Sequence, residues 1–218
     1  MRAAKAELKQ ARYGHKHAQP AVMILALAVV FGLIVSLIRH RGGAVRRIAA
    51  IPLRSAWLAG LALVLQWPLL RSRGGAVQEV QVQQMSFLLS LVLLLVFVWQ
   101  NRGLTGIQIV GLGVICNLVV ILVNGGLMPI TPDTLAQINP GSLPERWGPH
   151  LHYGYSKDVI LLREQTNLWA LSDILVLPPP FPRPTAFSVG DVLIAVGILV
   201  LLQGPADRQD LIVQRADA

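Results

Sequence analysis

Five long apolar runs constrain this chain more than any other feature of its sequence. The run at Leu104–Val123 extends over twenty residues without one charged side chain. A helix needs roughly 17–25 residues to cross the hydrocarbon core of a bilayer, and its backbone must satisfy its own hydrogen bonds there. We therefore predict an all-α, polytopic membrane protein with about five transmembrane helices, near residues 21–38, 55–70, 84–100, 104–123 and 187–203.

The composition agrees with a membrane location. Only 14% of the residues are charged and 54% are hydrophobic, whereas soluble domains carry about 25% charged residues. The net charge of +8 could suggest nucleic-acid binding, but the cations lie in clusters beside the apolar runs. That pattern is typical of topology signals and lipid headgroup contacts. We expect the lipid bilayer as a partner, other membrane protein subunits as candidate partners, and no nucleic acid.

The charge distribution also predicts the domain organisation. Residues 1–22 form a basic leader, residues 23–203 a single membrane domain and residues 204–218 a polar tail. Cation counts on the short loops place the carboxyl terminus inside and the long loop 124–186 outside the cell. The leader would then be exported despite its five cations, a conflict that disappears if translation starts at Met23.

The stretch "NGGLMPITPDT" at Asn124–Thr134 separates the fourth apolar run from this long loop. Asn and Gly tolerate the left-handed conformation that ends a helix. Thr131 is suited to cap a new short helix, with Pro132 at its first position and Asp133 near the positive end of its dipole. The alternative interpretation is a binding loop, because glycines let a backbone approach a ligand closely at a membrane boundary.

The segment 157–177, "KDVILLREQTNLWALSDILVL", combines leucines at helical spacing with charged residues. We expect an amphipathic, helical segment that either lies in the membrane interface or folds over the helix bundle. Glu164 and Asp173 could act as paired carboxylates, but on a continuous helix they would face opposite directions. Asp191 fits a capping box with Ser188 at the start of the fifth helix; a charge inside the membrane would instead indicate function.

Other motifs are uninformative about chemistry. Cys116 is the only cysteine, and the pair His150 and His152 lacks a third ligand at a metal-binding spacing. We predict no catalytic residues, no metal and no cofactor. Gln66, Gln108 and Asn117 are expected to join helices by hydrogen bonds, and a stripe of small residues is expected to allow close packing, namely Ala28, Gly32 and Ser36.

From Met23 onward the chain resembles a bacterial integral membrane family that is catalogued only as a domain of unknown function. The resemblance rests on "NRGL", "NGGLMPITPDTL", "KDVILLREQTNLWALSDILVLPPP" and "FSVGDVLIAVGI", in this order, and covers nearly all of residues 23–203. It implies a compact helical bundle. It implies no reaction.

Three hypotheses about function follow. The leading one is a non-enzymatic accessory or scaffold protein of the bacterial cytoplasmic (inner) membrane. The second is a small-molecule or lipid binding or transport protein with a site at the outer loop, whose candidate residues are Asn124, Asp133, Lys157, Glu164, Asp173 and Asp191. The third is a membrane-embedded enzyme that uses Glu164 or Asp173.

Overall fold

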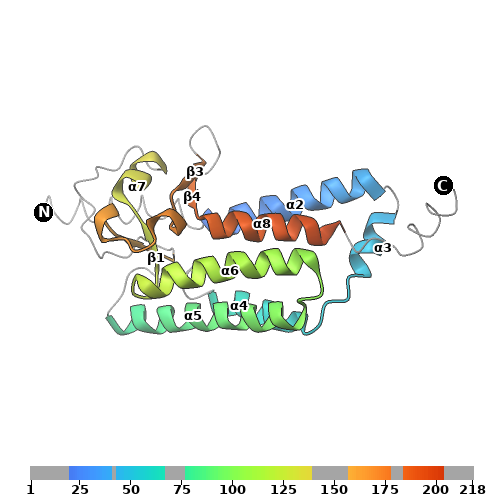
Figure 1. Ribbon diagram of the computed structural model, residues 1–218, viewed down its shortest axis with the longest axis horizontal. Helices are drawn as coiled ribbons and strands as arrows, with labels where there is room; N and C mark the ends of the chain where they lie inside the picture. Colours follow the sequence, from blue (N-terminus) through green and yellow to red (C-terminus); the bar gives the residue numbers. More distant parts are fainter. Residues whose placement is uncertain (1–19, 41–42, 67–76, 139–156, 178–183, 204–218) are drawn as a thin grey trace, which may run out of the picture.

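The computed structural model describes residues 20–40, 43–66, 77–138, 157–177 and 184–203. Figure 1 shows the long helices lying lengthwise beside one another, with α3 at one end of this bundle and short strands with α7 at the other. The helices are α2 (Pro20–His40), α3 (Ala44–Ala49), α4 (Ala56–Gln66), α5 (Val77–Gln100), α6 (Thr105–Val123), α7 (Pro132–Ile138) and α8 (Val189–Leu202).

The five helices expected from the apolar runs are all present. The bounds of α6 and α8 agree with the expected ones within two residues, whereas α5 begins at Val77 and not near residue 84. The basic leader up to residue 19, the end of the second run at 67–70, His150, His152 and the tail 204–218 lie outside the described residues.

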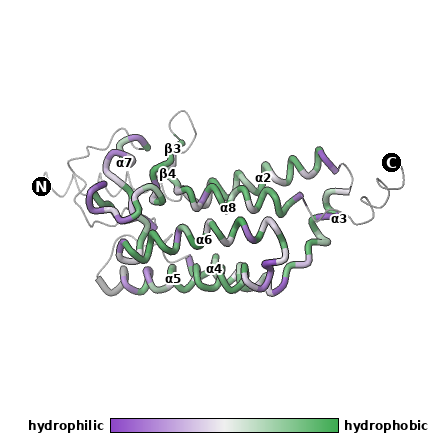
Figure 2. The backbone as a smooth tube through the Cα atoms, viewed as in Figure 1, coloured by the Kyte–Doolittle hydropathy of each residue, from purple (hydrophilic) through white to green (hydrophobic). Residues whose placement is uncertain are grey.

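Two helical stretches are long and apolar enough to cross a membrane, Gln81–Gln100 and Thr105–Val123, judged by length and composition. The apolar parts of α2, α4 and α8 are shorter in the described residues. Figure 2 shows hydrophobic residues along the bundle and hydrophilic residues concentrated at its two ends. Large apolar side chains are exposed on the outer faces of the helices, including Val30, Phe31, Leu63, Met85, Leu112 and Leu122, a surface that suits contact with lipid.

Helices α6 and α8 approach each other closely along a line of glycines. A Cβ atom added to Gly113 would lie 2.5 Å from the carbonyl oxygen of Gly190, and one added to Gly197 would lie 2.6 Å from the backbone nitrogen of Val110. Both distances are too short for a side chain, so the two backbones can meet only because these residues lack one. We call Gly106, Gly113, Gly190 and Gly197 the glycine seam.

The small-residue stripe on α2 is used within the chain. A Cβ on Gly32 would lie 2.9 Å from the Cδ1 atom of Leu202, and Gln203 donates a hydrogen bond to the carbonyl of Gly32 over 3.4 Å. Gly32 of the stripe therefore packs on the end of α8 within the chain. Of the helix amides, Gln66 does join helices, because it donates to Ser90 on α5 over 3.0 Å; Gln108 bonds only to the nearby carbonyl of Arg102.

At the α3 end of the bundle, Asn101 connects two turns of the chain. Its side chain accepts a hydrogen bond from the backbone nitrogen of Arg54 over 2.7 Å and donates to the carbonyls of Arg54 and Phe97. The following Arg102 stacks on the ring of Trp99, 4.2 Å from its centroid. The short "NRG" link thus joins α5 and α6 as neighbours, and Asn101 also holds the start of α4.

The opposite end carries what we call the loop layer, which comprises the described residues between α6 and α8. Asn124 ends α6, and Gly125 and Gly126 have φ of 86° and 93°. Thr131 caps α7 by accepting from the backbone nitrogen of Thr134 over 3.2 Å. These three features confirm the predicted helix stop and restart.

The prediction of a helical segment over 157–177 is wrong, although the described residues are mostly helical, as the predicted class requires. This segment contains β2 (Asp158–Ile160), the 3-10 turns η3 (Arg163–Gln165) and η4 (Trp169–Leu171), and β3 (Leu175–Leu177). β2 pairs in parallel with β1 (Met128–Ile130), and β3 pairs antiparallel with β4 (Thr185–Phe187). Val159, Ile160 and Leu161 pack with residues distant in sequence, from α6, β1 and α7, and this packing favours a strand over a helix.

Candidate functional site

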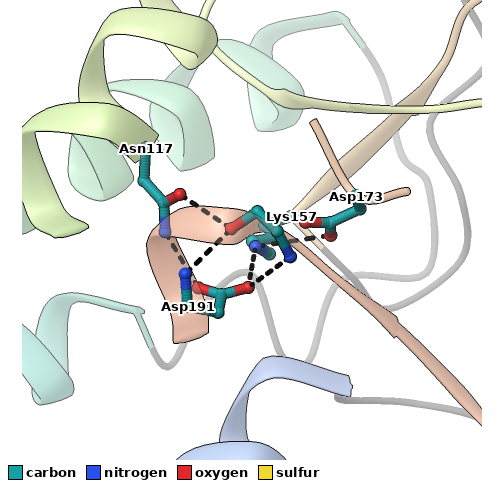
Figure 3. Close-up of polar contacts among 5 residues, drawn as sticks. Asn117, Lys157, Asp173 and Asp191 are labelled. Atoms are coloured by element: carbon teal, nitrogen blue, oxygen red, sulfur yellow. Dashed lines mark hydrogen bonds and ion pairs between the residues drawn. The ribbon is translucent and has the colours of Figure 1, made fainter. Parts of the chain in front are cut away.

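Lys157 lies at the centre of a buried group of polar residues where the loop layer meets α8. Its Nζ atom is 3.4 Å from Oδ2 of Asp173 and 3.4 Å from Oδ2 of Asp191. Figure 3 shows the ammonium between the two carboxyl groups. The Asp173 side chain is fully buried, and the Lys157 side chain is 14% exposed. The ion pairs therefore form largely out of contact with water.

Helices α6 and α8 contribute the rest of this group. Asn117 donates to Oδ1 of Asp191 over 2.8 Å and accepts from the hydroxyl of Ser188 over 2.8 Å. Ser188 and Asp191 also form the predicted capping box, with both reciprocal bonds to the backbone present. Asp191 thus has more than a capping role, because the same carboxyl group holds Asn117 of α6 and Lys157 of the loop layer.

The backbone fixes the position of Lys157 and Asp173. Lys157 directly precedes β2, and its carbonyl accepts a hydrogen bond from the backbone nitrogen of Met128 over 3.0 Å. The backbone nitrogen of Asp173 donates to the carbonyl of Pro129 over 3.2 Å. Strand β1 therefore binds both segments, and this places the two side chains against the first turn of α8. We call Asn117, Lys157, Asp158, Asp173, Ser188 and Asp191 the Lys157 cluster.

The cluster holds one ammonium and three carboxyl groups, and its electrostatics follow from this excess of acids. Burial lowers the pKa of Lys157, but the attraction of Asp173, Asp191 and Asp158 outweighs burial and raises the pKa above its ordinary value. Burial raises the pKa of Asp173 well above its usual range; Lys157 opposes this shift, and Asp158 and Asp191 add to it. We infer that Lys157 keeps its charge and that the Asp173 carboxyl takes up a proton more readily than an exposed aspartate does.

Three of the six candidate residues meet in this cluster, namely Lys157, Asp173 and Asp191. The other three do not belong to it. Asn124 is hydrogen bonded to the backbone of Val120 and Asn167, Asp133 is exposed in the first turn of α7, and Glu164 is exposed in η3. Glu164 and Asp173 therefore form no carboxylate pair.

Sequence reasoning did not assign Asp158, Asn117 or Ser188 to a binding site. Asp158 is fully buried beside Lys157, and its position next to a lysine is the signal that could have found it. For Asn117 the signal is weaker. Asn117 lies one helical turn after Gly113, and Asp191 directly follows Gly190. The glycine seam brings these two turns of α6 and α8 together.

The cluster can hold a proton and an ion pair, but its ammonium already occupies the space between the carboxyl groups. Among the described residues, no group of three or more His, Cys, Asp or Glu side chains could hold a metal ion. The cluster therefore resembles an internal connection between loop layer and helices more closely than an open binding site.

Comparisons with known proteins give a family but no activity. The sequence model described as "Family of unknown function (DUF5317)" matches residues 50–203, which excludes α2. A protein of Thermotoga maritima named "Uncharacterized protein" is 28% identical over 112 residues, which cover 51% of this chain and 59% of that protein. The chain thus spans about 59% of the length of this relative. No solved structure matches.

Proposed function

The chain belongs to DUF5317, a family of unknown function, so its membership implies no activity. From its own residues we propose that it is a non-enzymatic scaffold or accessory subunit of the bacterial cytoplasmic membrane. In this proposal α2, α4, α5, α6 and α8 all cross the bilayer, and the loop layer lies on the outer side. The exposed apolar side chains on the helices support the membrane location.

The observation that carries the scaffold role is the pairing of the Lys157 ammonium with carboxyl groups of two different parts of the chain. Lys157 bonds to Asp173 of its own loop layer and to Asp191 of α8, each over 3.4 Å. A fixed ion pair of this kind holds the loop layer in one position on the bundle. A shared apolar core reinforces it, since Met128 and Leu161 of the loop layer pack with Phe87 of α5 and Val120 of α6. The result is a rigid surface on one side of the membrane.

A scaffold should be isolated with a fixed partner. We expect the protein, extracted from its native membranes in mild detergent, to migrate as a complex of constant stoichiometry in native mass spectrometry. Lys157→Met should release the partner while α-helical circular dichroism is retained, whereas the exposed Arg46→Met should keep it. Isolation of the wild type as a monomer under every extraction condition contradicts the proposal.

The crossing of the membrane by α6, which the five-span arrangement requires, has its own test. Single cysteines at Gln165 in the loop layer and at Gly103 in the α5–α6 link, both exposed, are introduced into a Cys116→Ser background. A maleimide that cannot cross membranes should label residue 165 in intact cells and residue 103 only after permeabilisation. If both residues are labelled from the same side of the membrane, α6 does not cross it and the arrangement is contradicted.

The excess of carboxyl groups favours a second candidate, a binding protein for a small cation such as the headgroup of a lipid. The cluster holds three carboxyl groups and one ammonium, so a second positive charge that came near it would be attracted. Choline and ethanolamine should then raise the unfolding temperature of the wild type but not that of an Asp173→Asn variant. An equal response of both proteins contradicts this candidate.

A further inference from the structure

The turn at residues 162–169 of the loop layer exposes apolar side chains beside the end of a candidate span. Leu162 is 42% exposed and Leu168 is 49% exposed. Leu168 also has φ of 54°, in the left-handed region that is unfavourable for a leucine. If the turn faced water, Leu168 would have both a strained backbone and an exposed apolar side chain, and each of these is unfavourable.

The position of this turn along the bundle is fixed by hydrogen bonds. Asn167 donates from its backbone to Oδ1 of Asn124 over 2.9 Å and from its side chain to the carbonyl of Val123 over 3.1 Å. Asn124 returns a bond to the carbonyl of Asn167 over 2.9 Å. The turn is therefore attached to the last residues of α6, where the apolar stretch Thr105–Val123 ends.

The same turn carries an arginine stacked on a tryptophan. The guanidinium carbon of Arg163 lies 4.0 Å from the centroid of the Trp169 ring. Tryptophan and arginine both favour the boundary between hydrocarbon and water, because each has an apolar body and a polar group. Arg102 and Trp99 form the matching pair at the other end of α5, 4.2 Å apart. The two pairs lie at opposite ends of the bundle and are suited to the two surfaces of one bilayer.

We propose that residues 162–169 form an interfacial anchor that inserts Leu162 and Leu168 into the headgroup region of the bilayer beside the end of α6. The charges of Arg163 and Glu164 cancel within the turn, so we assign the boundary between headgroups and acyl chains as the binding partner, and not an anionic lipid. This inference rests on the proposed crossing of the membrane by α6. The anchor holds the loop layer down on the membrane surface.

The experiment measures depth in the membrane by fluorescence quenching. Leu168, Gln165 and Leu112 are each replaced by cysteine in a Cys116→Ser background, labelled with bimane and reconstituted in phosphatidylcholine nanodiscs. Lipids carry a nitroxide either near the headgroup or deep in the acyl chain. Leu112 lies in the middle of α6 with its side chain 53% exposed and reports on the span, whereas Gln165 is the matched control in the same turn.

We expect shallow nitroxides to quench the label at residue 168 at least threefold more than the label at residue 165, and deep nitroxides to quench the label at residue 112. Quenching at 112 with equal values at 168 and 165 overturns the anchor and leaves the span intact. Absence of quenching at 112 overturns the crossing of α6, and the anchor with it.

A second variant separates insertion from a role in folding. Leu168→Gly removes the side chain and accepts the left-handed backbone without strain. If Leu168 anchors the turn, a bimane label at residue 162 should lose at least half of its shallow quenching in this variant, although the unfolding temperature in detergent is unchanged or higher. Unchanged quenching at residue 162 overturns the proposal.

Discussion

The glycine seam and the Lys157 cluster hold the same pair of helices in opposite ways. Along the seam, α6 and α8 meet because side chains are absent, and a Cβ on Gly113 would lie 2.5 Å from the carbonyl oxygen of Gly190. At the end of the seam, Asn117 and Asp191 meet through a hydrogen bond of 2.8 Å, and the ion pair of Lys157 with Asp191 attaches the loop layer to α8.

This difference teaches which property of the protein depends on which contact. Close packing of backbones depends on shape alone and is indifferent to pH and salt. The cluster depends on the balance between one ammonium and three buried carboxyl groups, and therefore on protonation. The helix pair should accordingly respond to volume, and the attachment of the loop layer to charge.

The largest effect is expected for Lys157→Met, which removes the cation from the cluster. Breaking a buried ion pair costs about 3–5 kcal/mol, because charges are left without a partner. We expect a loss in the free energy of unfolding of about 4 kcal/mol at neutral pH, measured by chemical denaturation in detergent. Arg46→Met, at an exposed position, should change the free energy of unfolding by less than about 0.5 kcal/mol. Equal losses in the two variants would show that the cluster does not stabilise the fold.

A somewhat smaller effect is expected for Gly113→Val, which places a side chain in the glycine seam. Overpacking costs typically 1–3 kcal/mol. We expect about 3 kcal/mol, because the nearest atom is the backbone carbonyl oxygen of Gly190 on α8, which a side-chain rotation cannot move away. Gly60→Val is the matched control, since a Cβ there meets nothing within 4 Å. The loss at Gly113 should not vary between pH 4 and 8; a loss that follows pH would contradict a contact of shape alone.

Asn117→Leu tests the point where the two modes of contact meet. Asp191 and Ser188 would each lose a buried partner, and a buried polar group without a partner costs about 1–3 kcal/mol. We expect a loss of about 2 kcal/mol in the free energy of unfolding. Gln108→Leu, whose exposed side chain bonds only to the nearby Arg102 carbonyl, should be close to neutral. A similar loss at both positions would mean that the amide matters for α6 itself.

The smallest effect concerns pH. Because burial raises the pKa of Asp173 in the folded protein, its protonation favours folding, and this contribution is fully present below the ordinary pKa and is lost as pH rises through the raised one. The unfolding temperature of the wild type should thus fall between pH 4 and neutral pH, and Asp173→Asn should flatten this dependence. Glu164→Gln, exposed on η3, should retain the wild-type slope; a slope shared by all three proteins would place the titration elsewhere.

Much of the fold could be predicted, because apolar runs and capping residues act over short stretches of the chain. The apolar run at 104–123 forms α6, the Asn124 stop and the Thr131 restart are present, and the Ser188–Asp191 capping box forms as expected. Each of these depends on residues within a few positions of one another. The segment 157–177 could not be predicted, because its strand β2 forms by pairing with β1, about thirty residues earlier.

The candidate site shows the same division. Lys157, Asp173 and Asp191 were selected as polar residues near the predicted membrane boundary, and the structure brings them together. Asn124, Asp133 and Glu164 were selected on the same grounds and have other surroundings. A charged residue looks alike in the sequence whether its side chain is exposed or buried. Only the folded backbone, which places Asp173 against Pro129 and Lys157 against Met128, separates the two sets.

The sequence alone therefore determined where helices form and where they end, because hydropathy and capping act over a few residues. It also indicated the membrane and the family. Only the tertiary structure decided which helices touch, through the glycine seam, and which charges are buried together, in the Lys157 cluster. The physical reason is that close approach and desolvation are properties of two segments at once, and neither segment carries them by itself.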